Sequence, residues 1–113
     1  ETLTGTIEND IIFAGEGDDT INGTSGEDRL SGGNGADVFI FSRDDGSSII
    51  TDFSTMDGDQ VDVSKFGFAN WAELQPHLTA TIGNNTQLTL DTDTFVYFED
   101  IVYDQLSETD FII

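Results

Sequence analysis

Residues 5–40 read GTIENDIIF, AGEGDDTIN, GTSGEDRLS and GGNGADVFI, four consecutive units of nine residues. An aspartate stands at the sixth place of every unit, and a large apolar residue stands at the eighth. The aspartates are Asp10, Asp19, Asp28 and Asp37, and the apolar residues are Ile12, Ile21, Leu30 and Phe39. Glycine or another small residue occupies most of the first four places. A glycine-rich turn with a fixed acid, followed by a fixed apolar residue, predicts a solenoid of stacked coils.

Each unit is expected to form six residues of turn and three of strand. Side chains alternate along a strand, so the eighth-place residue points inward and its two neighbours point outward. Two units make one coil of 18 residues, so units one and three stack on one side, and units two and four on the other. One inward apolar residue per strand makes no core alone, but stacked coils make a continuous one.

This stacking places Asp10 beside Asp28 and Asp19 beside Asp37. Neighbouring strands lie ~4.8 Å apart, and two carboxylates at that distance repel by roughly 3 kcal/mol at an effective dielectric constant near 20. Because the net stability of a domain is typically only ~5–15 kcal/mol, a cation is expected between the stacked aspartates. Carboxylate and carbonyl oxygens favour calcium, which accepts ~6–8 oxygens in flexible geometry. Magnesium sheds water reluctantly, and zinc prefers the Cys and His ligands that these turns lack.

The four units resemble the G-G-x-G-x-D-x-U-x nonapeptide of RTX, or hemolysin-type, calcium-binding proteins. Unit two departs from it at Ala14, and unit one has Glu8 where the fourth-place glycine belongs. In that family, one turn supplies the carbonyls of places two and four and its aspartate. The turn one coil on supplies the carbonyls of places one and three and its own aspartate. The resemblance implies an all-β fold, a parallel β-roll with antiparallel C-terminal capping strands and one short helix.

Carried onto this chain, the resemblance implies four sets of calcium ligands, of which the first two are complete. The first set is Thr6, Glu8, Asp10, Gly23, Ser25 and Asp28, and the second is Gly15, Gly17, Asp19, Gly32, Asn34 and Asp37. The third set is Gly33, Gly35 and Asp37 with Asp52, and the fourth is Thr24, Gly26 and Asp28 with Asp44 or Asp45. We therefore expect at least two calcium ions and up to four. The alternative is that these segments are ordinary aspartate-glycine turns that bind no ion. That interpretation gives no reason for four units in register.

The composition favours conditional order. The chain has 113 residues, the length of one domain, and 23 acidic against three basic residues give a net charge of −20. Such a chain repels nucleic acids and anionic membranes. High charge with only 36% hydrophobic residues borders on disorder, so we expect a chain that is unfolded without cation and folded with it. No stretch is apolar enough to span a membrane, and no signal peptide is seen.

We expect a single domain over 1–113, with the repeats in 5–40, a degenerate coil and strands in 41–69, and a C-terminal cap in 70–113. Because the repeats begin almost at Glu1, we expect this sequence to be part of a longer protein. In the middle segment, 41–48 reads as a loop, and 49–53 and 60–63 read as strands. The run IITDF…GDQVDVSKF resembles the segment that follows the nonapeptides in the C-terminal domains of serralysin-type proteases and other type I-secreted proteins.

In the cap, residues 70–75 predict a short helix with Asn70 as N-cap, ended or kinked by Pro76. Residues 87–90 and 94–98 alternate around an Asp-Thr-Asp turn and predict a hairpin. We expect a short strand at 101–103, a helical turn capped by Ser107, and a final strand at 110–113. Trp71 is expected in the core, and the single histidine, His77, is expected to be structural.

The last 17 residues, YFEDIVYDQLSETDFII, resemble the C-terminal end of type I secretion substrates. The resemblance implies an extracellular protein whose C-terminal domain aids secretion, folds on calcium binding and stabilises an attached upstream domain, with the type I secretion apparatus as a transient partner. The alternative is a polysaccharide- or surface-binding module of a secreted adhesin or alginate-modifying enzyme, which exposure of Tyr97, Tyr103 and Trp71 on one face would support. No catalytic constellation can be argued, so we expect no enzyme activity, and no nucleic-acid partner or membrane insertion.

Overall fold

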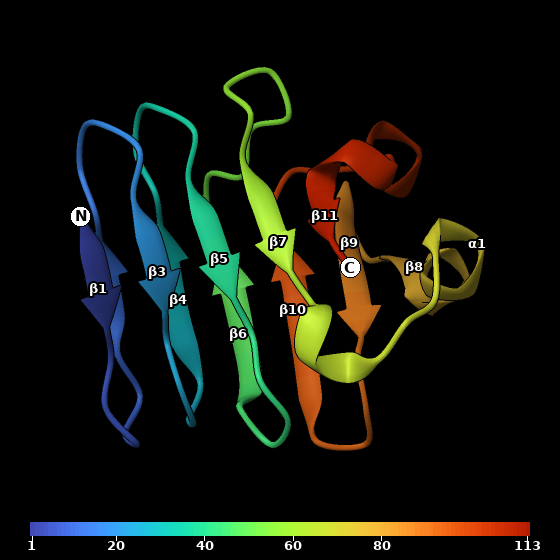
Figure 1. Cartoon of the computed structure of the whole chain (residues 1–113), viewed down its shortest axis with the longest axis horizontal. Coiled ribbons are helices and arrows are strands. Elements are labelled where there is room, and N and C mark those ends of the chain that lie inside the picture. The colour runs from blue at the N-terminus through green and yellow to red at the C-terminus, as the bar shows by residue number, and fades with distance from the viewer.

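The computed structural model describes all of residues 1–113 as two sheets wound from one chain (Figure 1). Five strands form the first sheet, in the order β1 (Thr2–Thr4), β3 (Thr20–Asn22), β5 (Val38–Ile40), β7 (Gln60–Asp62) and β11 (Phe111–Ile112). Six strands form the second sheet, in the order β2 (Ile11–Phe13), β4 (Asp28–Ser31), β6 (Gly46–Ile50), β10 (Thr94–Phe98), β9 (Asn85–Thr89) and β8 (Leu78–Thr81). The chain alternates between the two sheets through the repeats, so the predicted parallel β-roll is confirmed.

The register repeats the sequence period. Ile12 pairs with Leu30 in parallel, and Ile21 pairs with Phe39, so equivalent places of units two apart lie side by side. The step then lengthens, because Leu30 pairs with Ile50 and Phe39 with Val61, which are 20 and 22 residues on (50 − 30 and 61 − 39). The roll therefore continues beyond the last nonapeptide, with longer turns.

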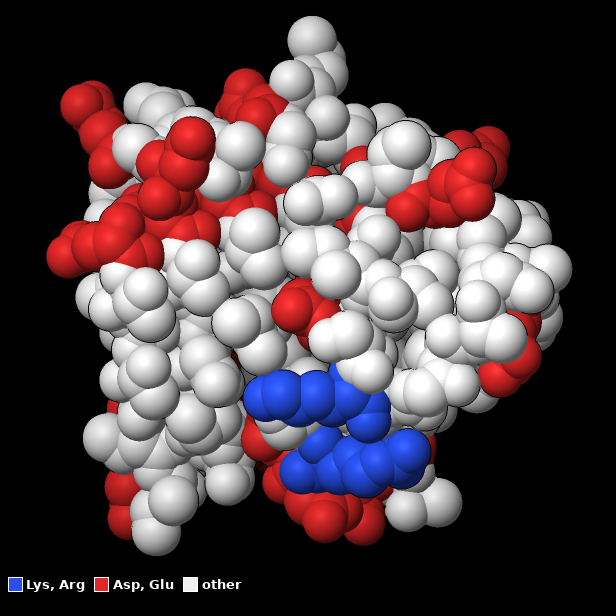
Figure 2. All heavy atoms as spheres, in the orientation of Figure 1, with Lys and Arg blue, Asp and Glu red and all other residues white.

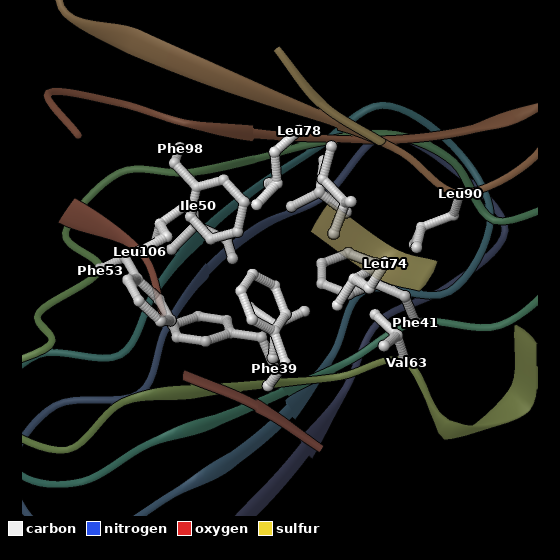
Figure 3. Packing of buried hydrophobic residues seen from close by; sticks show 14 of the residues in the cluster. Phe39, Phe41, Ile50, Phe53, Val63, Leu74, Leu78, Leu90, Phe98 and Leu106 are labelled. Carbon is white, nitrogen blue, oxygen red and sulfur yellow. The ribbon is translucent and has the colours of Figure 1, made fainter. Parts of the chain in front are cut away.

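The core lies between the two sheets (Figure 3). Ile21, Leu30 and Phe39 are fully buried, as the eighth-place pattern predicts, while Ile12 at the open end is half-buried. Aromatic rings continue the core toward the cap, since the Phe39 and Phe53 ring centroids lie 6.2 Å apart and those of Phe53 and Phe98 lie 5.2 Å apart. The outward residues of unit one stay uncovered, with Ile11 83% and Phe13 72% exposed.

The cap extends both sheets. The predicted hairpin is present as antiparallel β9 and β10, and β10 also pairs with β6 in parallel. The helix α1 (Trp71–Leu74) begins at Asn70, whose side chain accepts a hydrogen bond from the Glu73 amide at 3.0 Å. A 3-10 turn over Gln75–His77 contains Pro76 and follows the helix directly. None of the helices combines the length and apolar character that a membrane crossing requires.

Two local predictions were wrong, and two strands were missed. The strand predicted at 49–53 ends at Ile50. The segment 41–48 is a loop only to Asp45, because β6 starts at Gly46 and is paired on both sides, by β4 and by β10. Two flanking ladders therefore override its Gly-Ser-Ser composition. No strand forms at 101–103, since Asp100 turns the chain with φ +61° and Tyr103–Gln105 is a 3-10 turn. Strands β1 and β8 were not predicted at all.

Candidate metal centre

The repeat aspartates stack as expected and are tied to one another by hydrogen bonds. The Asp10 amide donates to Asp28 Oδ1 at 2.9 Å, and the Asp19 amide donates to Asp37 Oδ1 at 2.9 Å. Each carboxylate thus lies against the backbone of the aspartate one coil earlier. This arrangement uses one oxygen of each later aspartate and leaves the other free for a different partner.

Three aspartate oxygens are buried without any hydrogen-bond partner: Oδ2 of Asp19, Asp28 and Asp37. The three residues are 4%, 1% and 0% exposed, so water does not solvate them. A buried, unpaired carboxylate is strongly unfavourable unless a cation or a proton compensates it. Oxygens of this kind are the ligands that calcium prefers, so the residues present fit a calcium ion.

The electrostatics of the turns favour positive charge. Burial raises the pKa of Asp28 above its ordinary value, and the neighbouring Asp10 and Asp45 carboxylates raise it further. Burial likewise raises the pKa of Asp37, with added repulsion from the Asp19 carboxylate. Without a metal, these groups therefore hold protons more readily than free aspartates do. A divalent cation would remove that tendency, because it favours the ionised form.

Glycines let the stacked turns approach closely enough for carbonyl oxygens to line them. A Cβ on Gly33 would collide with the carbonyl oxygen of Gly15, and one on Gly35 would collide with that of Gly17. Both Gly33 (φ +86°) and Gly35 (φ +112°) also adopt backbone conformations that favour glycine. The predicted carbonyl ligands Gly15 and Gly17 therefore lie directly against the next coil of the same side.

No three side chains from His, Cys, Asp and Glu form a group that could hold a metal. An ion in these turns would therefore need backbone oxygens in addition to its aspartates. Each of the first two predicted sets combines two carboxylates with four carbonyls.

The first and second predicted sets differ in what occupies their oxygens. In the first set, the Thr6 amide donates to Asp10 Oδ2 at 2.7 Å, and the Thr24 hydroxyl donates to the Thr6 carbonyl. In the second set, Oδ2 of both Asp19 and Asp37 has no partner. The second set therefore contains two buried carboxylate oxygens without a hydrogen-bond partner, whereas the first set contains one.

The residues of the third predicted set lie near one another, but Asp52 does not stack on Asp37. Asp52 accepts hydrogen bonds from the Gly32 amide at 3.0 Å and the Gly33 amide at 2.8 Å. The stacked position belongs to Asp59, which accepts from the Asp37 amide at 2.9 Å and the Ser54 amide at 2.9 Å. Burial raises the pKa of Asp59 to about 6.

Sequence reasoning missed Asp59, although a signal was present. Asp59 stands two residues before the buried Val61, as each sixth-place aspartate stands two residues before its apolar residue. The motif is displaced from the nine-residue period, because the coil from Phe39 to Val61 spans 22 residues, four more than the 18-residue coils of the repeats. A search for an aspartate two residues before a large apolar residue, without the nine-residue spacing, would have found Asp59.

In the fourth predicted set, Ser48 takes the place opposite Asp28 in the ladder. Asp45 is buried, and its Oδ2 accepts from the Ser42 amide at 2.7 Å. Two of the three basic residues lie at this turn: Lys65 Nζ is 3.0 Å from Ser42 Oγ, and the Arg43 guanidinium lies over the Phe66 ring. Figure 2 shows basic side chains beside acidic ones near the lower edge of the view.

Comparison with known proteins identifies the repeats. Residues 4–39 match the family model of the RTX calcium-binding nonapeptide repeat, in four copies. None of the curated protein sequences matches the chain.

Two solved structures share the fold. The AlgE6R3 subunit of the Azotobacter vinelandii mannuronan C5-epimerase aligns over 98% of this chain and 77% of its own, with a TM-score of 0.68 and 24% identity. The extracellular lipase LipA of Serratia marcescens aligns over 99% of this chain but only 20% of its own, with a TM-score of 0.69 and 19% identity. At these identities the likeness concerns the fold alone. Residues 4–39 therefore match four copies of the RTX calcium-binding nonapeptide repeat, and they fold as a parallel β-roll.

Proposed function

We propose that this chain is a calcium-dependent folding module, unfolded where free calcium is scarce and folded where calcium fills the stacked turns. The observation that carries this proposal is the set of three buried carboxylate oxygens, in Asp19, Asp28 and Asp37, that have no hydrogen-bond partner. An unpaired buried charge opposes folding by an amount on the order of several kcal/mol. Binding that occurs only in the folded state adds stability as the ion concentration rises, so calcium and folding are coupled.

The first two ligand sets are the proposed calcium sites. Each combines a stacked aspartate pair, Asp10 with Asp28 or Asp19 with Asp37, with four carbonyls of the same turns. Calcium there would neutralise the carboxylates that the fold brings together. Sites in extracellular modules of this kind typically bind calcium at ~10⁻⁴–10⁻³ M, which suits a protein that meets calcium only outside the cell.

Far-UV circular dichroism tests the coupling. The metal-free chain should give a coil spectrum at neutral pH, and calcium at several millimolar should convert it to a strand spectrum. Magnesium at the same concentration should convert it far less, because magnesium gives up its bound water reluctantly. A strand spectrum that is the same with and without calcium would remove the basis of the proposal.

We further propose that the module is the C-terminal part of a larger extracellular protein exported by a type I secretion apparatus. The support is the resemblance of residues 97–113 to the ends of such substrates, together with calcium-coupled folding. A chain that is unfolded in a calcium-poor cytosol can be threaded through a channel, and folding outside would hinder its return and stabilise an attached upstream domain. In this role the module itself has no catalytic activity.

Export can be measured in cells that carry a type I exporter. The whole chain should reach the medium, and a variant with the order of residues 104–113 scrambled should stay inside. Equal amounts of both in the medium would contradict the assignment of the signal to this end.

Polysaccharide binding has less support. Tyr103 is 45% exposed, and Tyr97 lines a shallow groove with Arg29 and Ile49. Trp71, however, packs against Phe111 in the cap, with ring centroids 5.5 Å apart, so it does not join an exposed row of aromatic side chains.

A further inference from the structure

We propose that Asp52 is a positioning residue for the second calcium site, where it holds the Gly32–Gly33 turn from the side of the cap. It would act through the Gly32 carbonyl and not as a ligand itself. This inference rests on the proposed function, because it concerns how one of the proposed calcium sites is built. The residues that carry it are Asp52, Gly32, Gly33 and Asp37.

Asp52 takes the place of a backbone acceptor that units one and two use. The first-place amide of unit one, Gly5, donates to the ninth-place carbonyl of Asn22 at 2.8 Å. The first-place amide of unit two, Ala14, donates to the ninth-place carbonyl of Ser31 at 2.9 Å. Gly32 is the first-place residue of unit four, but its amide donates to Asp52 Oδ1 at 3.0 Å. A side chain thus takes over where the nine-residue register ends.

The second hydrogen bond of Asp52 orients the peptide group between the two glycines. The Gly33 amide donates to Asp52 Oδ2 at 2.8 Å. Because a trans peptide is planar and its N–H and C=O point in opposite directions, this bond turns the Gly32 carbonyl away from Asp52. The Gly32 carbonyl is one of the six proposed ligands of the second ion.

Gly32 itself lies against the unpaired carboxylate oxygen of Asp37 in the second site. A Cβ on Gly32 would collide with Asp37 Oδ2, the fully buried oxygen that has no hydrogen-bond partner. Two consecutive glycines have little intrinsic preference for one peptide orientation. The charge-assisted pair of bonds from Asp52 supplies that preference, and both Asp52 oxygens are used in doing so.

The test compares the whole chain with three variants by calcium titration calorimetry. Asp52→Asn removes the charge and one of the two acceptors. Asp57→Asn is the matched control. Asp57 is exposed and lies in the same connection between β6 and β7 as Asp52, and its substitution removes the same charge. Leu106→Ala is the stability control, because Leu106 is buried in the cap and lies outside the proposed sites. Terbium bound in place of calcium reports the number of coordinated waters through its luminescence lifetime in H₂O and D₂O.

In Asp52→Asn, the affinity of one ion should fall ~10-fold or more, the range seen when groups that orient metal ligands are lost. The other ion should be nearly unaffected, and the water count at saturating terbium should stay that of the wild type. Asp57→Asn should leave both ions unchanged.

Three results would overturn the inference: unchanged affinities in Asp52→Asn, an equal loss at both ions as in Leu106→Ala, or an additional bound water, which would make Asp52 a ligand. A wild-type chain that binds no calcium at all would instead overturn the proposed function, and this inference with it.

Discussion

Aspartates that look alike in the sequence have different surroundings in the fold. Asp59 has both carboxylate oxygens bonded to backbone amides, whereas Asp37 has one bonded and one buried without a partner. The first arrangement is complete without a metal, and the second is not. The difference separates an aspartate that closes a turn from one that is suited to bind an ion.

Asp37→Asn should have opposite effects on the two states of the chain. Removing the buried charge should leave the metal-free fold less unfavourable, while the calcium midpoint should rise ~10-fold or more because a charged ligand is lost. A calcium titration followed by circular dichroism measures both effects. The matched control is Asp57→Asn, which should behave as the wild type. An unchanged midpoint in Asp37→Asn would contradict the second ligand set.

Gly33→Ala should destabilise the calcium-saturated fold by more than ~1 kcal/mol, because the new Cβ meets the Gly15 carbonyl in addition to the cost of a positive φ. Gly67→Ala is the matched control. Gly67 has φ +76°, but a Cβ added there would meet no atom within 4 Å, so this variant should show the conformational cost alone. Denaturant unfolding in calcium measures both variants, and equal losses would argue against close stacking at Gly33.

At the scale of the elements, the repeat period predicted β2 to β5 and their pairing. Each nonapeptide repeats the same turn and the same inward residue, so one period determines strand, face and neighbour together. The stacking of Asp10 on Asp28 follows from the same count and is present in the hydrogen bonds. The first two ligand sets could therefore be proposed from the repeat spacing and the family resemblance it carries.

The period could not predict the elements beyond Ile40. The longer coils move Asp59 out of the nine-residue count, and β6 forms because strands on both sides pair with its polar residues. Strand β8 consists of Leu-Thr-Ala-Thr and is held by its antiparallel pairing with β9. Such strands depend on partners that lie elsewhere in the sequence, and local composition does not reveal them.

Asn70→Ala should cost ~0.5–2 kcal/mol in the calcium-saturated state, because the Glu73 amide loses its side-chain acceptor at the start of α1. The exposed Asn84 gives the matched control, Asn84→Ala, which should cost little. Chemical denaturation in excess calcium compares the two. Equal stability of both variants would mean that this cap does not hold the helix.

For the molecule as a whole, charge decides when the fold can form. A net charge of −20 on 113 residues opposes compaction unless cations or protons neutralise part of it. The roll concentrates this charge further by stacking its aspartates on each side.

Acid should therefore stabilise the metal-free fold. Burial raises the pKa of Asp28 and Asp37 in the fold and that of Asp59 to about 6. Groups whose pKa is raised by folding stabilise the fold below their ordinary pKa, and this contribution is lost as pH rises through the raised value. Metal-free protein should be more ordered near about pH 4.5 than at about pH 7 by circular dichroism. Less order at the lower pH would contradict this reasoning.

The central claim is that the stacked aspartates cannot come together at neutral pH without a divalent cation, and small-angle X-ray scattering tests it most directly. With calcium, the radius of gyration should approach the 12.7 Å of the folded chain. In metal-free buffer it should expand toward the ~34 Å of an unfolded chain of this length. A metal-free chain at neutral pH that is as small as the calcium-bound one would contradict the account.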